Sequence, residues 1–206
     1  MLITLAISSL AFTETLMVGN FESGDLSGWQ EKKFSGKTAY EIVSVDGIKA
    51  LHAKSSSSAS GMFKEMDVDL EKTPYMNWRW KISNTYGPVN EKTKDGDDYP
   101  ARVYVIFSAG IFFWKTKALN YVWSGSEPEG SSWPNAFTPK SRMIAAHTGE
   151  EDAGRWVTEK VNVRDDAKRY FGEDIKKAHA VALMTDSDNG GGKAEAWYGD
   201  IYFTSE

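Results

Sequence analysis

The stretch YEIVSVDGIKALHA, residues Tyr40–Ala53, decides the fold class. Apolar and polar residues alternate along Tyr40–Val45, as they do in a strand with one buried face. Asp46-Gly47 follows, and this dipeptide favours the two-residue turn that joins antiparallel strands. Ile48–Ala53 then has the composition of a second strand. The stretch therefore predicts a β-hairpin.

Short apolar segments between turn residues recur along the rest of the chain. Arg102–Ser108 is the clearest buried strand and Ala118–Ser124 is another. One short helix is predicted, capped by Asp165 or Asp166 and ended by Gly172. Roughly a dozen strands, one helix and no strand–helix alternation predict an all-β antiparallel β-sandwich of jelly-roll type. The remaining strands are expected at Leu16–Phe21, Gly61–Leu70, Tyr75–Ile82, Met143–His147, Trp156–Val163, Ala178–Thr185 and Ala196–Thr204.

The composition limits the classes of function. A chain of 206 residues with 41% hydrophobic content fits a single domain. The 8 Trp, 9 Tyr and 10 Phe favour a β-rich fold and supply flat rings for a core or a surface. A formal net charge of −5, without any long basic run, argues against nucleic acid as a partner. The absence of cysteine excludes disulfides and thiolate chemistry.

The first twelve residues, MLITLAISSLAF, are mostly apolar. They are too short to cross a bilayer as a helix, which takes about 20 residues, so no transmembrane segment is predicted. Their length fits the apolar part of an export signal, although no Lys or Arg precedes Lys32. Residues 1–15 are therefore either a signal-peptide remnant or a first strand, and residues 16–206 form one β-sandwich domain. We favour an exported protein, periplasmic or extracellular.

Two long polar stretches interrupt the strands, Ser83–Pro100 and Gly125–Pro139. Loops of this length inside a domain are usually functional or mobile. The second loop carries Trp133, which we expect to act as a mobile lid over a binding site.

The loop TDSDNGGG near the end of the chain resembles a metal-binding loop at first sight. Asp186, Asp188 and Gly191 match positions one, three and six of an EF-hand, but Gly190 and Trp197 stand where further ligands are needed. The EF-hand interpretation therefore fails. An Asx-rich turn explains the loop without an ion, and contact with a polar ligand is compatible with that turn.

Aromatic and basic residues alternate in NWRWK, residues Asn77–Lys81. On a strand, Trp78 and Trp80 share one face while Arg79 and Lys81 share the other. In YVWSG, Tyr121 and Trp123 likewise share a face. Aromatic rings beside Arg, Asp and Asn suit sugar recognition, because ring faces stack on C–H surfaces and planar polar groups bond hydroxyls. The alternative is that the tryptophans fill the sandwich core.

An ordered set of motifs is similar to a bacterial family of exported domains of unknown function. The set comprises VGNFESGDLSGW, WRWK, DGDDYPARVYVIF, LNYVWSG, GRWVTEKVNVRDDAKRYFG and VALMTDSDNGGGKAEAWYGDIYF. The most specific pieces are YVWSG and the pair MTDSDN and WYGDI. In that family a Thr usually follows the Asn, and Gly190 stands there instead. The resemblance implies no activity.

The chain also resembles, more distantly, jelly-roll carbohydrate-binding modules with a galactose-binding-like fold. Asn20-Phe21-Glu22 and Gly28-Trp29 match their opening, and Gly199-Asp200-Ile201 matches their closing strand. This resemblance implies a structural Ca²⁺ held by Glu22 and Asp200 together with backbone carbonyls. Alternatively, Glu22 is a surface turn residue and Asp200 pairs locally.

These observations favour an exported, non-catalytic domain that binds carbohydrate or another polyhydroxylated ligand. One alternative is a polysaccharide hydrolase or lyase that uses loop carboxylates, and another is a structural interaction domain of the envelope. The residues expected at the ligand are Arg79, Arg102, Tyr121, Trp123, Trp133, Asp186, Asp188 and Asn189.

Overall fold

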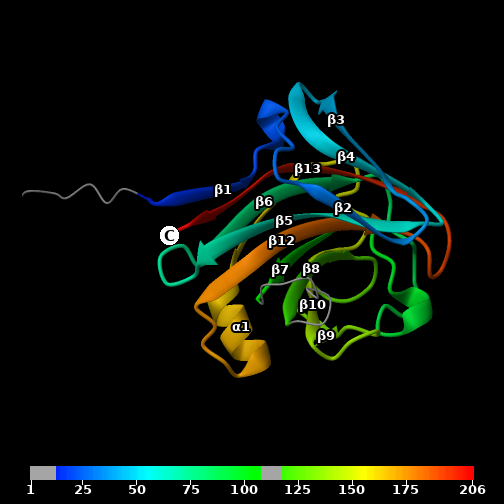
Figure 1. The fold of residues 1–206 in the computed structure, drawn as a ribbon. Coiled ribbons are helices and arrows are strands. Elements are labelled where there is room, and N and C mark those ends of the chain that lie inside the picture. Colours follow the sequence, from blue (N-terminus) through cyan, green and yellow to red (C-terminus); the bar gives the residue numbers. More distant parts are fainter. Residues whose placement is uncertain (1–12, 108–116) are drawn as a thin grey trace, which may run out of the picture.

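Two β-sheets pack face to face in the computed structural model (Figure 1). The structure describes residues 13–107 and 117–206. The interpretation of residues 1–12 as an export signal lies outside the described residues. The predicted β-sandwich is confirmed, since strands make up nearly all the regular structure and one α-helix accompanies them.

The first sheet, called sheet A, has the strand order β11-β6-β13-β4-β3. The long last strand β13 passes β4 with its first half, and β1 pairs with its second half. The register between β13 and β6 shifts between Tyr198 and Ile201, so the chain bulges at Gly199 and Asp200. The bounds are β1 Thr15–Gly19, β3 Ala39–Val45, β4 Ile48–Ser56, β6 Tyr75–Ile82, β11 Val157–Asn162 and β13 Lys193–Thr204.

The second sheet, called sheet B, has the order β2-β5-β12-β7-β8-β10-β9. Its pairs are antiparallel except β8 and β10, which run parallel. The chain crosses between the sheets at most connections, which is the jelly-roll arrangement expected from the sequence. Strands β2 and β9 were not predicted. The bounds are β2 Gln30–Ser35, β5 Ala59–Asp69, β7 Arg102–Ile106, β8 Ala118–Ser124, β9 Ser132–Pro134, β10 Ser141–Thr148 and β12 Lys177–Asp186.

The predicted hairpin joins β3 and β4. Val45 lies opposite Ile48, so Asp46 and Gly47 form a two-residue turn. Both turn residues have positive φ, 52° and 78°, which is the conformation of a type I′ turn. Glycine adopts this conformation without steric cost, and Asp tolerates it better than most residues.

The core between the sheets is rich in aromatic side chains. Trp78 and Trp80 point inward from β6 and meet Tyr121 and Trp123 from β8, with ring centroids 5.6 Å and 5.8 Å apart. All four are essentially inaccessible to solvent. The prediction that Trp78 and Trp80 share a face is confirmed, and it is the inner face.

One α-helix, α1 (Val163–Phe171), packs against β6 and β8. The Asn162 side chain caps it by accepting from the Asp165 amide, so the helix begins before the predicted caps. Gly172 ends it at φ 69°, as expected. Two 3₁₀ turns complete the described part, η1 (Phe21–Ser23) and η2 (Lys94–Gly96). Within residues 13–107 and 117–206, no helix has the length and apolarity needed to cross a bilayer.

Candidate functional site

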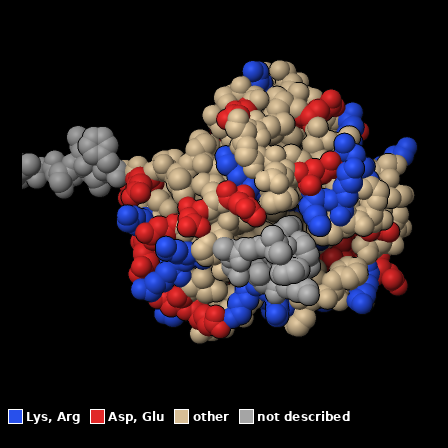
Figure 2. Space-filling model, in the orientation of Figure 1, with Lys and Arg blue, Asp and Glu red and all other residues tan. Residues whose placement is uncertain are grey.

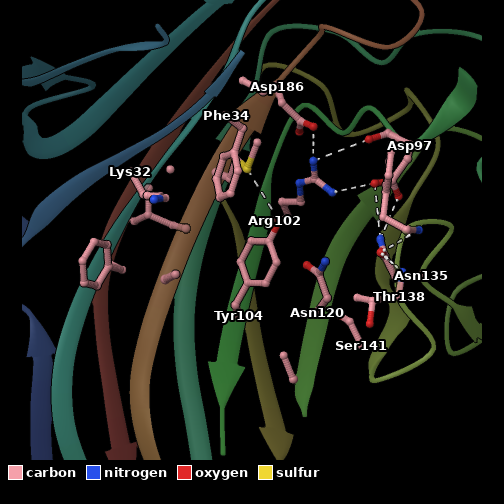
Figure 3. A pocket seen from close by; sticks show the side chains of 18 of the residues that line it. Lys32, Phe34, Asp97, Arg102, Tyr104, Asn120, Asn135, Thr138, Ser141 and Asp186 are labelled. Carbon is pink, nitrogen blue, oxygen red and sulfur yellow. Dashed lines mark hydrogen bonds and ion pairs between the residues drawn. The ribbon is translucent and has the colours of Figure 1, made fainter. Parts of the chain in front are cut away.

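A cleft of about 540 Å³ lies on the outer face of sheet B, the face turned away from sheet A (Figure 3). Alternation along β7 places Arg102, Tyr104 and Ile106 in the cleft, whereas the side chains between them join the core. Several side chains on the floor of the cleft are small, which leaves space above the sheet. These small residues are Ala59, Gly61, Ala118 and Ala182.

Arg102 lies at the polar end of the cleft and is only 4% exposed. Its guanidinium contacts the Asp186 carboxylate directly and lies 3.5 Å from the Asp97 carboxylate (Figure 3). Asp97 reaches this position from the loop between β6 and β7, and Asn135 donates to it at 3.2 Å. The long loop predicted as functional therefore supplies a buried acidic group, and the pair with Arg102 neutralises it.

The local field perturbs the ionisation of these groups. Burial raises the pKa of Asp97, and the nearby Arg102 opposes that shift. Burial lowers the pKa of Arg102, but neighbouring Tyr and Asp groups outweigh it, so its net pKa is raised. Burial and the charge of Asp98 raise the pKa of Asp188. The polar end of the cleft therefore resists additional negative charge.

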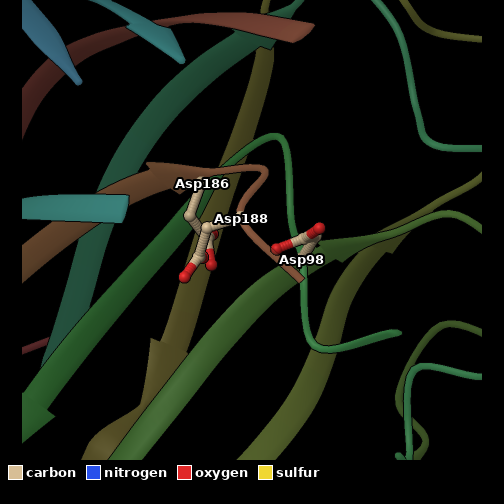
Figure 4. Close-up of side chains that lie close together, drawn as sticks. All are labelled: Asp98, Asp186 and Asp188. Carbon is tan, nitrogen blue, oxygen red and sulfur yellow. The ribbon is translucent and has the colours of Figure 1, made fainter. Parts of the chain in front are cut away.

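The loop after β12 closes this end of the cleft. Its backbone amides at Asn189 and Gly190 donate to the Asp98 carboxylate at 2.7–3.1 Å. Asp98, Asp186 and Asp188 each bring one oxygen within 4.8 Å of the others, a spacing that suits a metal ion (Figure 4). Two of the three carboxylates are already engaged, Asp98 by the turn amides and Asp186 by Arg102.

Two exposed phenylalanines line the cleft. Phe34, from edge strand β2, is 56% exposed, and Phe137, from the loop between β9 and β10, is 57% exposed. Asn135 accepts from the Phe137 amide while donating to Asp97, so this ring is tied to the polar end. Because both rings line one hollow, they give it exposed apolar surface of the kind that ligand sites have. In the described residues, Met17 is the third large apolar side chain of comparable exposure, and it lies outside the cleft.

Two buried polar atoms of the cleft residues have no partner within the described protein. They are Oδ1 of Asn120 and Nε of Arg102. The side-chain nitrogen of Asn120 lies 3.2 Å from Met143 Sδ. A thioether sulfur can accept a hydrogen bond, although a weak one, so the amide is oriented with its nitrogen toward the sulfur and its oxygen away from it. An unpaired buried polar atom costs free energy, and within the described residues this acceptor and this donor have no partner that offsets the cost.

The structure brings together half of the residues expected at a ligand. Arg102, Asp186, Asp188 and Asn189 all line the cleft. Tyr121 and Trp123 do not, because both rings lie on the inner face of β8 and are 0% exposed.

The other two expected ligand contacts also lie away from the cleft. Trp133 is 3% exposed and packs in β9 against Tyr99 and Met143, so it is a buried anchor and no lid. Arg79 lies on sheet A, on the opposite side of the sandwich.

The two residues expected to hold Ca²⁺ lie together, but the Glu22 carboxylate pairs with an arginine. The Glu22 amide donates to Asp200 at 2.8 Å, and the Arg79 guanidinium binds Glu22 at 2.5–2.8 Å. The positive charge at this place is therefore the guanidinium. A Ca²⁺ needs six or more oxygen ligands, and the residues present do not fit it.

Sequence reasoning missed Phe34, Phe137, Tyr104, Asn120 and Asn135 as cleft residues. Phe34 lies in KKFS, a strand too polar for the apolar pattern to reveal. Phe137 follows Asn135, whose Asx turn was a usable signal.

The face of the molecule in Figure 2 carries Lys and Arg interspersed with Asp and Glu. The fold and the cleft together define a β-sandwich with a candidate binding site on one sheet. The chain belongs to the family described as Protein of unknown function (DUF3047), which matches residues 27–202. Membership of a family of unknown function was expected from the motifs and is confirmed at that level.

Solved structures with a related arrangement include carbohydrate-binding modules and cellulases. One is the family 11 carbohydrate-binding module of Clostridium thermocellum in complex with a β-1,3-1,4-mixed-linked tetrasaccharide. The identity is 13%, the match covers 92% of this chain and 94% of that chain, and the TM-score is 0.47. A cellulase derived from Cel12A of Rhodothermus marinus has 12% identity, coverage of 92% and 100%, and a TM-score of 0.48. Similarity at this level transfers neither ligand nor activity. No curated protein matches the sequence.

Proposed function

We propose that this protein binds a saccharide in the cleft on the outer face of sheet B. The supporting observation is that two exposed aromatic rings, Phe34 and Phe137, line the same hollow as a set of planar polar groups. Sugars present apolar C–H faces and polar hydroxyl edges. A site for them therefore needs rings to stack on and amide, carboxylate and guanidinium groups to bond.

The rings and the polar groups would bind different parts of a sugar. Phe34 and Phe137 already expose their apolar surface, so no rearrangement of the core is needed. Arg102, Asp188 and Asn120 offer donors and acceptors at fixed positions, because the ion pairs and turn amides already hold the polar end. A preorganised site binds with less loss of conformational entropy.

Calorimetric titration against a saccharide array tests this function. We expect Phe34→Ala and Phe137→Ala each to weaken binding, by roughly tenfold per lost stacking contact of about 1.4 kcal/mol. Met17→Ala serves as the matched control, since Met17 is exposed but lies outside the cleft. If no saccharide binds, or if both Phe variants bind as the parent does, the proposed function is wrong.

The hydrolase alternative is checked with the same ligands. Its candidate groups are the Asp97 and Asp186 carboxylates, which both contact Arg102. Release of reducing ends that disappears in Asp97→Asn, while binding persists, would establish an enzyme. Binding without release supports a binding domain.

A bound Ca²⁺ is a separate candidate, favoured by the spacing of Asp98, Asp186 and Asp188. Titration of Ca²⁺ into chelator-treated protein tests it. Heat that is lost in Asp188→Asn would support a cation at this cluster, and the absence of heat removes it.

We also propose that the domain acts outside the cytoplasm, where polymeric saccharides are met. Cell fractionation with an antibody tests this location. Recovery in the cytoplasmic fraction alone would contradict it.

A further inference from the structure

The polar end of the cleft carries more negative than positive charge. Four carboxylates gather there, those of Asp97, Asp98, Asp186 and Asp188, and the guanidinium of Arg102 pairs with two of them, Asp97 and Asp186. Among the described residues, Lys32 also lines the cleft; it comes from β2 and lies across the hollow from Asp97 (Figure 3).

Asp188 is the carboxylate of this group whose negative charge is least compensated. Asp186 accepts from Arg102 and from the Tyr99 amide, and Asp97 faces Arg102 and Asn135. Asp188 is half-buried, and no Lys, Arg or His of the described residues forms an ion pair with it. Its oxygen lies within 4.8 Å of the oxygens of Asp98 and Asp186 (Figure 4).

Three carboxylates at this spacing repel one another, and partial burial strengthens the repulsion. A cationic ligand group would relieve that repulsion, whereas an anionic group would add to it. The raised pKa of Asp188, caused by burial and by Asp98, points in the same direction.

The unpartnered atoms give an independent indication of the ligand. Asn120 is 1% exposed, and its buried Oδ1 has no donor within the described residues. An ammonium or hydroxyl group supplies such a donor. The buried Nε of Arg102 needs an acceptor, which a ring or hydroxyl oxygen supplies. A ligand that carries both kinds of group satisfies both atoms.

Building on the saccharide function above, we propose that the cleft selects saccharides that carry a free amino group and places their ammonium against Asp188. An amino sugar has the C–H faces for Phe34 and Phe137, the oxygens for Arg102 and the ammonium for Asp188. Uronic acids, which carry a carboxylate, are disfavoured by the same field.

Matched oligosaccharides test this selection. A β-1,4-linked glucosamine oligomer, its fully N-acetylated counterpart and the cello-oligosaccharide of equal length differ only in the group at C2. The array carries the same C2 groups on galacto- and manno-configured oligomers, together with uronate oligomers. Dissociation constants are measured by calorimetry at low and high salt, at a pH where the amine is protonated. Asp188→Asn removes the charge, and Asp95→Asn, at an exposed position of the same loop as Asp97, is the control.

We expect the amine to bind roughly tenfold more tightly than the hydroxyl and N-acetyl forms. Salt should reduce this preference, Asp188→Asn should abolish it, and Asp95→Asn should keep it. Equal or tighter binding of the neutral or anionic forms overturns the selection but leaves the saccharide function in place. A preference that survives in Asp188→Asn overturns the assignment to that residue. If no oligosaccharide binds at all, both the selection and the saccharide function fail.

Discussion

Arg102 holds two carboxylates at the polar end of the cleft and is almost fully buried. Its aliphatic stem leaves a strand whose neighbouring residues face the core, while its guanidinium turns to Asp97 and Asp186. Desolvating three charged groups is costly, and their mutual attraction offsets that cost only while all partners are present. The positions of Asp97 and Asp186 at the polar end of the cleft therefore depend on Arg102.

Arg102→Met should destabilise the fold by about 3–5 kcal/mol, since it leaves two buried carboxylates without a cation. Urea denaturation measures the change in the free energy of unfolding. Arg155→Met is the control, because Arg155 is 75% exposed and should change stability by less than about 0.5 kcal/mol. Similar effects of the two substitutions would show that the buried ion pairs do not stabilise the cleft.

Gly199, in the closing WYGDI motif, is required by the side chain that crosses it. A Cβ on Gly199 would lie 2.5 Å from Arg79 Cγ and 2.8 Å from Arg79 Nε. Glu22 binds that same Nε, so Arg79 cannot swing away freely.

Gly199→Ala should therefore cost about 1–3 kcal/mol of folding stability through overpacking. Adding Arg79→Ala removes the obstacle, so the double variant should lose less than the sum of the two single variants. Thermal unfolding of all three variants measures this coupling. Strict additivity would contradict the clash.

Strands β10 and β11 meet at the edge of the sandwich through a titratable pair. His147 Nδ1, on β10, lies 3.7 Å from Glu159 Oε1, on β11, and Trp80 Nε1 donates to the same oxygen. Glu129 and Asp152 face His147 from the adjoining loops at 3.9 Å and 3.2 Å. Burial is the main cause that raises the pKa of Glu159 to about 8.

The raised pKa of Glu159 makes the free energy of unfolding decrease as the pH rises. Between pH 4.5 and pH 8 the folded protein holds the Glu159 proton and the unfolded chain does not, so stability falls as pH rises through that window. Glu159→Gln should flatten the fall in melting temperature. Glu151→Gln, at an exposed position of the neighbouring loop, should leave it unchanged. Equal pH profiles for the parent and Glu159→Gln would refute the assignment.

At the scale of elements, the sequence predicts strands better than it predicts which face of a strand is free. Turn chemistry identified the hairpin at Asp46-Gly47 because the signal is local. For strand β8 the pattern of residues cannot distinguish the core face from a ligand face, because all seven of its residues are buried. One face meets sheet A and the other is partly covered by Tyr99, from the loop before β7, and by Trp133 of β9. Tyr121 and Trp123 were therefore expected at a ligand although they belong to the core.

The polar half of the site was predictable for a different reason. Asp186, Asp188 and Asn189 follow directly after an apolar strand, so a position at the end of a sheet follows from the chain itself. The aromatic half depends on long-range placement. Phe34 and Phe137 lie about half the chain apart in the sequence. They line the same cleft only because β2 and the loop after β9 belong to the same side of the fold. No local pattern contains that information.

In the molecule as a whole, the turn η1, which follows the first strand, is joined to the last strand by a network around Glu22. Its amide donates to Asp200, which lies 178 residues further on, and its carboxylate binds Arg79. Contacts that close so long a loop constrain most of the chain. The guanidinium stands in the position at which the distant resemblance implied Ca²⁺.

In the Asp188→Asn variant, which lacks the separate candidate cation cluster, a chelator should therefore leave the melting temperature unchanged. Adding Glu22→Gln should lower the melting temperature whether or not Ca²⁺ is present. Differential scanning calorimetry with and without the chelator measures both effects. A chelator-induced decrease that disappears in Glu22→Gln would mean that Ca²⁺ does bind at this place.

A saccharide titration followed by the amide chemical shifts of the isotope-labelled protein tests directly whether the cleft is the binding site. We predict shifts that concentrate on the outer face of sheet B, at Phe34, Asn120, Phe137 and Asp188. Shifts confined to the outer face of sheet A, around Arg79 and Trp197, would contradict it.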